Sequence, residues 1–214
     1  MKYILKAAGN EPQSLKEVRS TPGSTYDDCN KADIRRALLK EQGHICAYCM
    51  SRISNDLDME GRPKMNIEHY VAQSGEDGEK LRLNYFNMLG VCRGGEGGPA
   101  HLMHCDKSRK NAILTIDPRK PQCEDMVKFT ANGTVFSEDE RVETDLNQTL
   151  SLNIRSLKSG RAAAIQAAKS TLKNYSKGAI QQQLKKLEQT GSEGKYEVYC
   201  QAAIYILRKK LHQL

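Results

Sequence analysis

The spacing of the cysteines constrains this chain more than any other feature of its sequence. Four of the seven lie in one 60-residue stretch, as Cys46, Cys49, Cys92 and Cys105, and the others, Cys29, Cys123 and Cys200, are scattered. In a reducing compartment, cysteines are more often metal ligands or buried thiols than disulfides. We therefore expect the scattered three to be small buried residues and the clustered four to share one site.

The clustered cysteines have the spacing of a zinc site. Cys46-Ala-Tyr-Cys49 has the spacing of a zinc knuckle, in which two thiolates bind one tetrahedral ion with Zn–S distances of about 2.3 Å. Cys92 and Cys105 form the second pair, and the glycine-rich loop between them closes the gap because loop length costs little entropy. His104 is the alternative fourth ligand to Cys105, and His101 is a further rival. The sequence predicts a structural Zn²⁺ here.

The order of apolar patterns and turn residues predicts an α+β chain in four parts. A helix follows the N-cap Asn30 and ends at Gly43, and an Asn132-Gly133 turn predicts a β-hairpin. Strand-like pieces cover 46–53, 64–71 and 87–92, a short helix covers 106–114, and a last helix covers 196–211. The parts are an N-terminal arm and helix (1–42), a zinc-bearing core (43–118), a hairpin connector (119–150) and a C-terminal helical region (151–214).

The positive charge of the chain is concentrated in its last part. Residues 1–150 carry 21 Lys and Arg against 23 Asp and Glu, whereas residues 151–214 carry 12 against 3. A segment of this charge can steer phosphates toward the protein, which indicates a nucleic-acid partner. The alternative is a solvated helix face.

Nothing in the sequence predicts insertion into a membrane. No run of about 18 apolar residues is present. The apolar stretch at the N-terminus is too short to be a signal peptide. We expect a cytoplasmic protein with no membrane partner.

Between the two cysteine pairs lies a group of residues suited to phosphodiester hydrolysis. His69 suits the removal of a proton from water, because the pKa of histidine lies near neutrality. The carboxylates of Glu68 and Asp106 suit a Mg²⁺ or Mn²⁺ ion that neutralises charge on the leaving oxygen. Asn87 is placed to accept a hydrogen bond from Nδ1 of His69 and leave Nε2 free for the proton.

This order of residues resembles the HNH endonucleases of the ββα-metal fold. The resemblance covers roughly residues 43–111 and implies a zinc-stapled ββα-metal core. It implies that Glu68 and Asp106 hold the catalytic ion, that His69 is the general base and that Asn87 orients it. The sequence departs from the family in having Asp106 where His or Asn is usual, and in the loop that splits Cys92 from Cys105.

The longer layout resembles the PtuB-type HNH proteins, which act with a PtuA-type ATPase in Septu and retron antiviral defence. This resemblance implies an ATPase partner. If the protein belongs to a retron, it also implies a reverse transcriptase and its msDNA as partners. The target would be DNA, or RNA such as tRNA. Lys107, Arg109 and Lys110 follow the last expected metal ligand and are expected to contact substrate phosphate.

Two functions therefore compete. The first is a metal-dependent nuclease, which needs Glu68, His69, Asn87 and Asp106. The second is a non-catalytic zinc-ribbon adaptor that binds nucleic acid or a protein partner, and it needs only the cysteines. Replacing His69 with alanine separates them, because only the nuclease loses its function.

Overall fold

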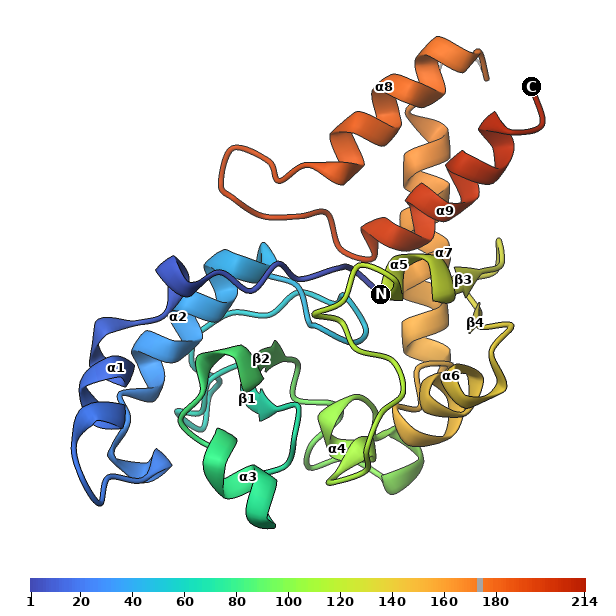
Figure 1. Ribbon diagram of the computed structural model, residues 1–214. Coiled ribbons are helices and arrows are strands. Elements are labelled where there is room, and N and C mark those ends of the chain that lie inside the picture. The colour runs from blue at the N-terminus through green and yellow to red at the C-terminus, as the bar shows by residue number, and fades with distance from the viewer. Residues whose placement is uncertain (173–174) are drawn as a thin grey trace.

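The computed structural model describes residues 1–172 and 175–214 as an α+β protein with short strands. The N-terminal half, with its two-stranded sheet, forms the lower left of Figure 1, and three longer helices form the upper right. Within the described residues no helix combines the length and the apolar character that a membrane crossing requires.

The N-terminal half contains two longer helices, two short helices and one sheet, joined by segments that include short 3-10 turns. Its elements are α1 (Gln13–Ser20), α2 (Lys31–Gln42), β1 (Asn66–His69), α3 (Glu76–Leu81), β2 (Met88–Val91) and α4 (Asp106–Arg109). Asn30 caps α2 by accepting from two backbone N–H groups, and Gly43 ends it in the left-handed conformation, as the sequence predicts. The expected N-terminal arm is correct only in part, because α1 lies within it.

Strands β1 and β2 pair in antiparallel register, with Glu68 opposite Leu89 and His69 opposite Met88. The side chain of Gln42, at the end of α2, fixes the neighbouring edge of this sheet. Its amide oxygen accepts from Gly90 N at 2.7 Å, and its amide nitrogen donates to Gly90 O at 2.8 Å. The end of α2 is therefore tied to the strand that precedes Cys92.

The C-terminal half consists of a small connector and three helices. Its elements are α5 (Cys123–Met126), β3 (Lys128–Phe129), β4 (Val135–Phe136), α6 (Glu140–Thr144), α7 (Arg155–Ser170), α8 (Lys177–Glu188) and α9 (Cys200–Leu211). The predicted hairpin is present, with β3 paired to β4 around the Asn132-Gly133 turn. The final helix begins at Cys200 rather than at residue 196.

One hydrophobic core runs through both halves. It joins residues of the cysteine-bearing turns, such as Tyr48 and Met50, with Leu157 and Ile165 of α7 and Ile204 of α9. A second, smaller core packs Leu15 of α1 against Ile34 and Leu38 of α2. The helices of 151–214 therefore share their packing with the cysteine-bearing region.

Candidate functional site

The four clustered cysteines meet at one buried point. Their Sγ atoms all lie within 4.8 Å of one another. Cys46 Sγ is 3.9 Å from Cys105 Sγ, and Cys49 Sγ is 3.7 Å from Cys92 Sγ. A tetrahedral ion with sulfur ligands at about 2.3 Å separates those sulfurs by about 3.8 Å. These cysteines could therefore bind a metal such as zinc.

The first pair lies on a tight turn, and the strand predicted over 46–53 is wrong. Met50 N donates to Cys46 O at 3.0 Å, and Cys46 N donates to Ser51 O at 2.9 Å. In a strand, residues three apart point to opposite faces, so Cys46 and Cys49 could not hold the same ion. The turn directs both thiols to one side. Hydrogen bonds with Cys105, Cys46, Cys92 and Ser51 hold the pKa of the Cys49 thiol well below its ordinary value.

The glycine-rich loop returns the chain so that Cys105 meets Cys92, as the sequence predicts. His104 N donates to Gly94 O at 3.0 Å, and a Cβ on Gly94 would lie 2.2 Å from His104 O. Cys105 completes the cluster, and His104 lies beside it with Nε2 3.7 Å from Cys92 Sγ. His101 is exposed and outside the cluster.

A second polar group, the carboxylate cluster, lies between β1 and α4 and consists of Glu68, Asp106, Arg109 and Tyr48. Tyr48 Oη donates to Glu68 Oε1 at 3.2 Å, and the Arg109 guanidinium also contacts that oxygen. Asn66 Nδ2 donates to Asp106 Oδ2 at 3.5 Å. Glu68 lies near the end of its strand, which is what a shared site with Asp106 requires.

The Asp106 carboxyl lies close enough to change the ionisation of Glu68. Burial, followed by the charge of Asp106 and a hydrogen bond with it, raises the pKa of Glu68 to about 8, although Arg109 opposes the shift. Two carboxyl groups that share a site hold one proton between them, or a cation in its place. Glu68 and Asp106 are therefore a pair that could accept a divalent ion.

The orientation of His69 differs from the expectation. Its Nε2 donates to the carbonyl of Arg82 at 2.9 Å, so Nδ1 is the nitrogen left to accept a proton. Burial lowers the pKa of His69, which keeps the ring neutral at neutral pH. The edge of the Tyr26 ring packs against it, with ring centroids 4.7 Å apart.

The side chain of Asn87 hydrogen-bonds to backbone groups rather than to the His69 ring. Its Oδ1 accepts from Val71 N at 2.8 Å, and its Nδ2 donates to Val71 O at 2.9 Å. The predicted bond to Nδ1 of His69 is therefore wrong, because the side chain is used to clamp the peptide groups that follow β1. Asn87 holds the backbone that carries His69.

The helix that follows Cys105 is shorter than predicted, and its basic residues have different surroundings. It ends at Arg109, because the backbone of Lys110 leaves the helical region with a positive φ of 55°. Arg109 is 3% exposed and bonds to Glu68, Tyr48, Tyr70 O and Ala112 O, so its predicted contact with substrate phosphate is wrong. Lys107 pairs with Glu96 at 3.0 Å, and Lys110 is exposed.

Sequence reasoning missed Tyr48 and Tyr26. Tyr48 lies between the two cysteines of the knuckle, and its hydroxyl connects that turn to Glu68. Tyr26 comes from the polar N-terminal segment, where no motif marked it. His69 is 6% exposed, and the Tyr26 ring is part of what covers it.

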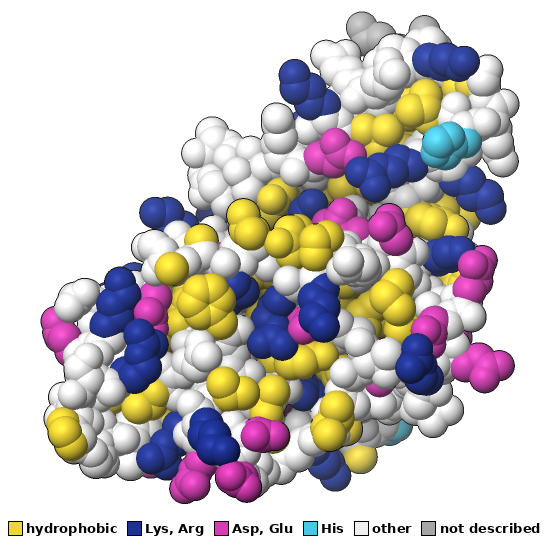
Figure 2. All heavy atoms as spheres, viewed as in Figure 1, with side chains coloured by type: hydrophobic (Ala, Val, Ile, Leu, Met, Phe, Trp, Pro, Cys, Tyr) yellow, Lys and Arg dark blue, Asp and Glu magenta, His cyan; other side chains and the backbone are white. Residues whose placement is uncertain are grey.

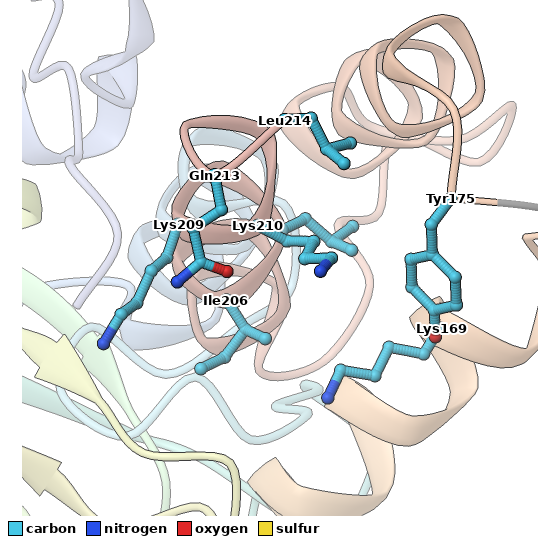
Figure 3. A pocket seen from close by; sticks show the side chains of 8 residues that line it. Lys169, Tyr175, Ile206, Lys209, Lys210, Gln213 and Leu214 are labelled. Carbon is cyan, nitrogen blue, oxygen red and sulfur yellow. The ribbon is translucent and has the colours of Figure 1, made fainter.

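The basic C-terminal region contains a cavity of about 500 Å³ between α7 and α9. Lys169 and Lys210 extend into it from these two helices, beside Tyr175, whereas Lys209 points away (Figure 3). No acidic residue lines this cavity among the described residues. Elsewhere Lys and Arg are interspersed with Asp and Glu on the face in Figure 2.

Comparison of the chain with protein-family models and with curated proteins finds no match.

Proposed function

We propose that this chain is a metal-dependent HNH endonuclease that hydrolyses phosphodiester bonds of DNA, or of an RNA such as tRNA. The observation that carries the proposal is the pairing of Glu68 with Asp106 across 38 residues of sequence, next to a neutral histidine on the same strand. An antiparallel strand pair followed by a short helix, stapled by four cysteines, is the layout that this family uses.

In this proposal, each residue of the site has one role in hydrolysis. A Mg²⁺ or Mn²⁺ ion held by Glu68 and Asp106 would neutralise charge on the phosphate and the leaving oxygen. Nδ1 of His69 accepts the proton of the attacking water, and the Arg82 carbonyl fixes the ring through Nε2. Asn87 holds the backbone after His69, and Arg109 with Tyr48 orients Glu68.

The cysteine cluster would have a structural role in this nuclease. Zn²⁺ bound to four thiolates has no open position for a substrate, which is the arrangement of structural rather than catalytic zinc. The ion would hold the first turn, the end of β2 and the start of α4 together. Glu68 and Asp106 would then keep their relative positions because Asp106 directly follows Cys105.

Cleavage by the purified chain tests the proposal. Plasmid DNA and tRNA are each incubated with Mg²⁺ or Mn²⁺, using Glu68→Gln, Asp106→Asn and the exposed control Glu60→Gln. We expect chelation of the divalent ion and each of the first two substitutions to abolish cleavage, and the control to cleave like wild type. Undiminished cleavage by Glu68→Gln and Asp106→Asn would refute the assigned roles.

We also propose that the nuclease acts in antiviral defence with a PtuA-type ATPase, and within a retron also with a reverse transcriptase and its msDNA. The basic cavity of α7 and α9 supports an acidic partner or a nucleic acid at this end. Removal of 151–214 is a poor test, because these helices belong to the shared core. Co-purification with the ATPase, compared between wild type and Lys169→Glu/Lys210→Glu, tests the role of this surface.

The alternative function is a zinc-ribbon adaptor without catalysis. It is favoured by the burial of Glu68 and His69, which keeps both from solvent in this conformation. An adaptor would bind nucleic acid or its partner equally well after Glu68→Gln or His69→Ala. A protein that binds nucleic acid but never cleaves it, with either metal ion and with its partner present, would favour this alternative.

A further inference from the structure

Arg161 of α7 is the largest side chain that is fully buried in the described residues, at 1% exposure. Its guanidinium donates to Gly133 O at 2.6 Å, to Leu152 O at 2.7 Å and to Asn153 Oδ1 at 3.2 Å. All three acceptors are uncharged. A buried charge is costly unless it is paired, and these three bonds engage Nε and Nη2 without supplying a negative charge.

The groups that act on the charge of Arg161 are two thiols and a phenol rather than carboxylates. Burial lowers the pKa of Arg161 to about 10, and Cys49, Tyr199 and Cys105 oppose that shift. No Asp or Glu of the described residues is among the causes. Two members of the cysteine cluster, Cys49 and Cys105, are therefore among the groups that favour the charged form of Arg161.

A metal-loaded cysteine cluster would supply this negative charge. Four thiolates exceed the charge of one Zn²⁺ by two negative charges. The cluster is buried, so water does not screen this excess. A cation within reach stabilises such a centre, and Arg161 remains protonated at neutral pH.

The backbone also joins the cysteine cluster to the C-terminal helices. Cys105 N donates to Leu150 O at 2.8 Å, two residues before the carbonyl of Leu152 that Arg161 holds. On the other side of the cluster, Tyr199 N donates to Met50 O at 3.1 Å. The turns that carry the cysteines are thus bonded to the segments before α7 and before α9.

We propose that Arg161 is the charge partner of a zinc tetrathiolate at Cys46, Cys49, Cys92 and Cys105, so that zinc binding and the docking of α7 stabilise each other. The proposal concerns the metal centre and does not depend on nuclease activity. It makes α7 part of the zinc site, although α7 contributes no ligand. It also explains why a basic residue lies in the core.

Zinc affinity of the full chain, measured by competition with a chromogenic chelator, tests this role. Loss of a group that supports metal ligands weakens binding by about 10- to 100-fold, and we expect this range for Arg161→Met. Arg161→Lys keeps the charge and should bind zinc more tightly than Arg161→Met. The matched control is Leu157→Ala, which creates a cavity in the same helix and leaves the charge unchanged. Its zinc affinity should fall by much less than that of Arg161→Met.

Two results would overturn the proposal. One is an Arg161→Met variant that binds zinc within twofold of wild type. The other is a Leu157→Ala variant that loses as much affinity as Arg161→Met, because the effect would then come from packing.

Hydrogen exchange of the wild-type chain provides a second test that does not require a stable variant. Without zinc the four cysteines no longer form a tetrathiolate centre beside α7, so α7 should exchange faster after zinc removal. Helix α1 belongs to the separate smaller core and is the internal reference. We expect a larger increase in α7 than in α1. An equal change in the two helices, or unchanged protection of α7, would contradict the proposal.

Discussion

The replacement of Asn87 by alanine tests how the histidine-bearing strand is held. Asn87 is 2% exposed and makes two hydrogen bonds to the peptide groups of Val71. Each buried polar group left without a partner costs about 1–3 kcal/mol. Val71 is half-buried, so water can reach part of the vacated site, and we expect a total loss of about 2–3 kcal/mol. For a chain of this length the loss lowers Tm by about 4–12 °C.

Chemical denaturation of wild type and Asn87→Ala gives the free energy of unfolding directly. The matched control is Asn84→Ala, because Asn84 caps the 3-10 turn that contains Asn87 through one solvent-exposed hydrogen bond, accepted from Phe86 N at 2.9 Å. We expect the control to lose about 1 kcal/mol or less. Equal losses of free energy of unfolding in the two variants would refute this role of Asn87. The exposed cap at Asn84 and the two bonds of Asn87 would then contribute equally to stability.

Three further predictions concern the metal, pH and charge. Cys105→Ser should lower zinc affinity, whereas His104→Ala should keep one zinc per chain by elemental analysis; the reverse order would assign the fourth ligand to His104. Burial lowers the pKa of His69, so the unfolded chain takes up a proton as the pH falls below about 6.5 while the folded chain does not. The free energy of unfolding, measured by denaturation, should therefore fall from pH 7.5 to 5.5. His69→Gln should make this fall smaller. If the fall is the same in His69→Gln, another group causes the pH dependence. Lys169→Glu/Lys210→Glu should weaken nucleic-acid binding at low salt by at least tenfold in fluorescence anisotropy, and wild-type affinity would exclude this cavity as a binding surface.

The four-cysteine cluster was predictable from the sequence because its residues are chemically distinctive. Cys46 and Cys49 show the knuckle spacing, and the glycines after Cys92 indicate a loop that can return the chain to Cys105. The helix over 31–42 was predictable for a similar reason, since Asn30 and Gly43 mark its two ends. Local signals of this kind determine local structure.

The parts that could not be predicted depend on contacts between distant segments. The bond from His69 to a carbonyl thirteen residues away depends on the path of the loop through Arg82. Arg109 looked like a surface cation because the sequence could not show that Glu68 and Tyr48 surround it. Arg161 belonged to a basic tail by composition, and only the packing of α7 places it in the core.

Cleavage by a His69→Ala variant tests the central claim most directly. Wild type and variant are loaded with zinc, their zinc content and Tm are matched, and each is incubated with plasmid DNA and with tRNA in Mn²⁺ or Mg²⁺. If cleavage requires the partner ATPase, the same comparison is made in its presence. The account predicts that the variant keeps its zinc and its fold and loses cleavage. Cleavage at the wild-type rate by His69→Ala would contradict it.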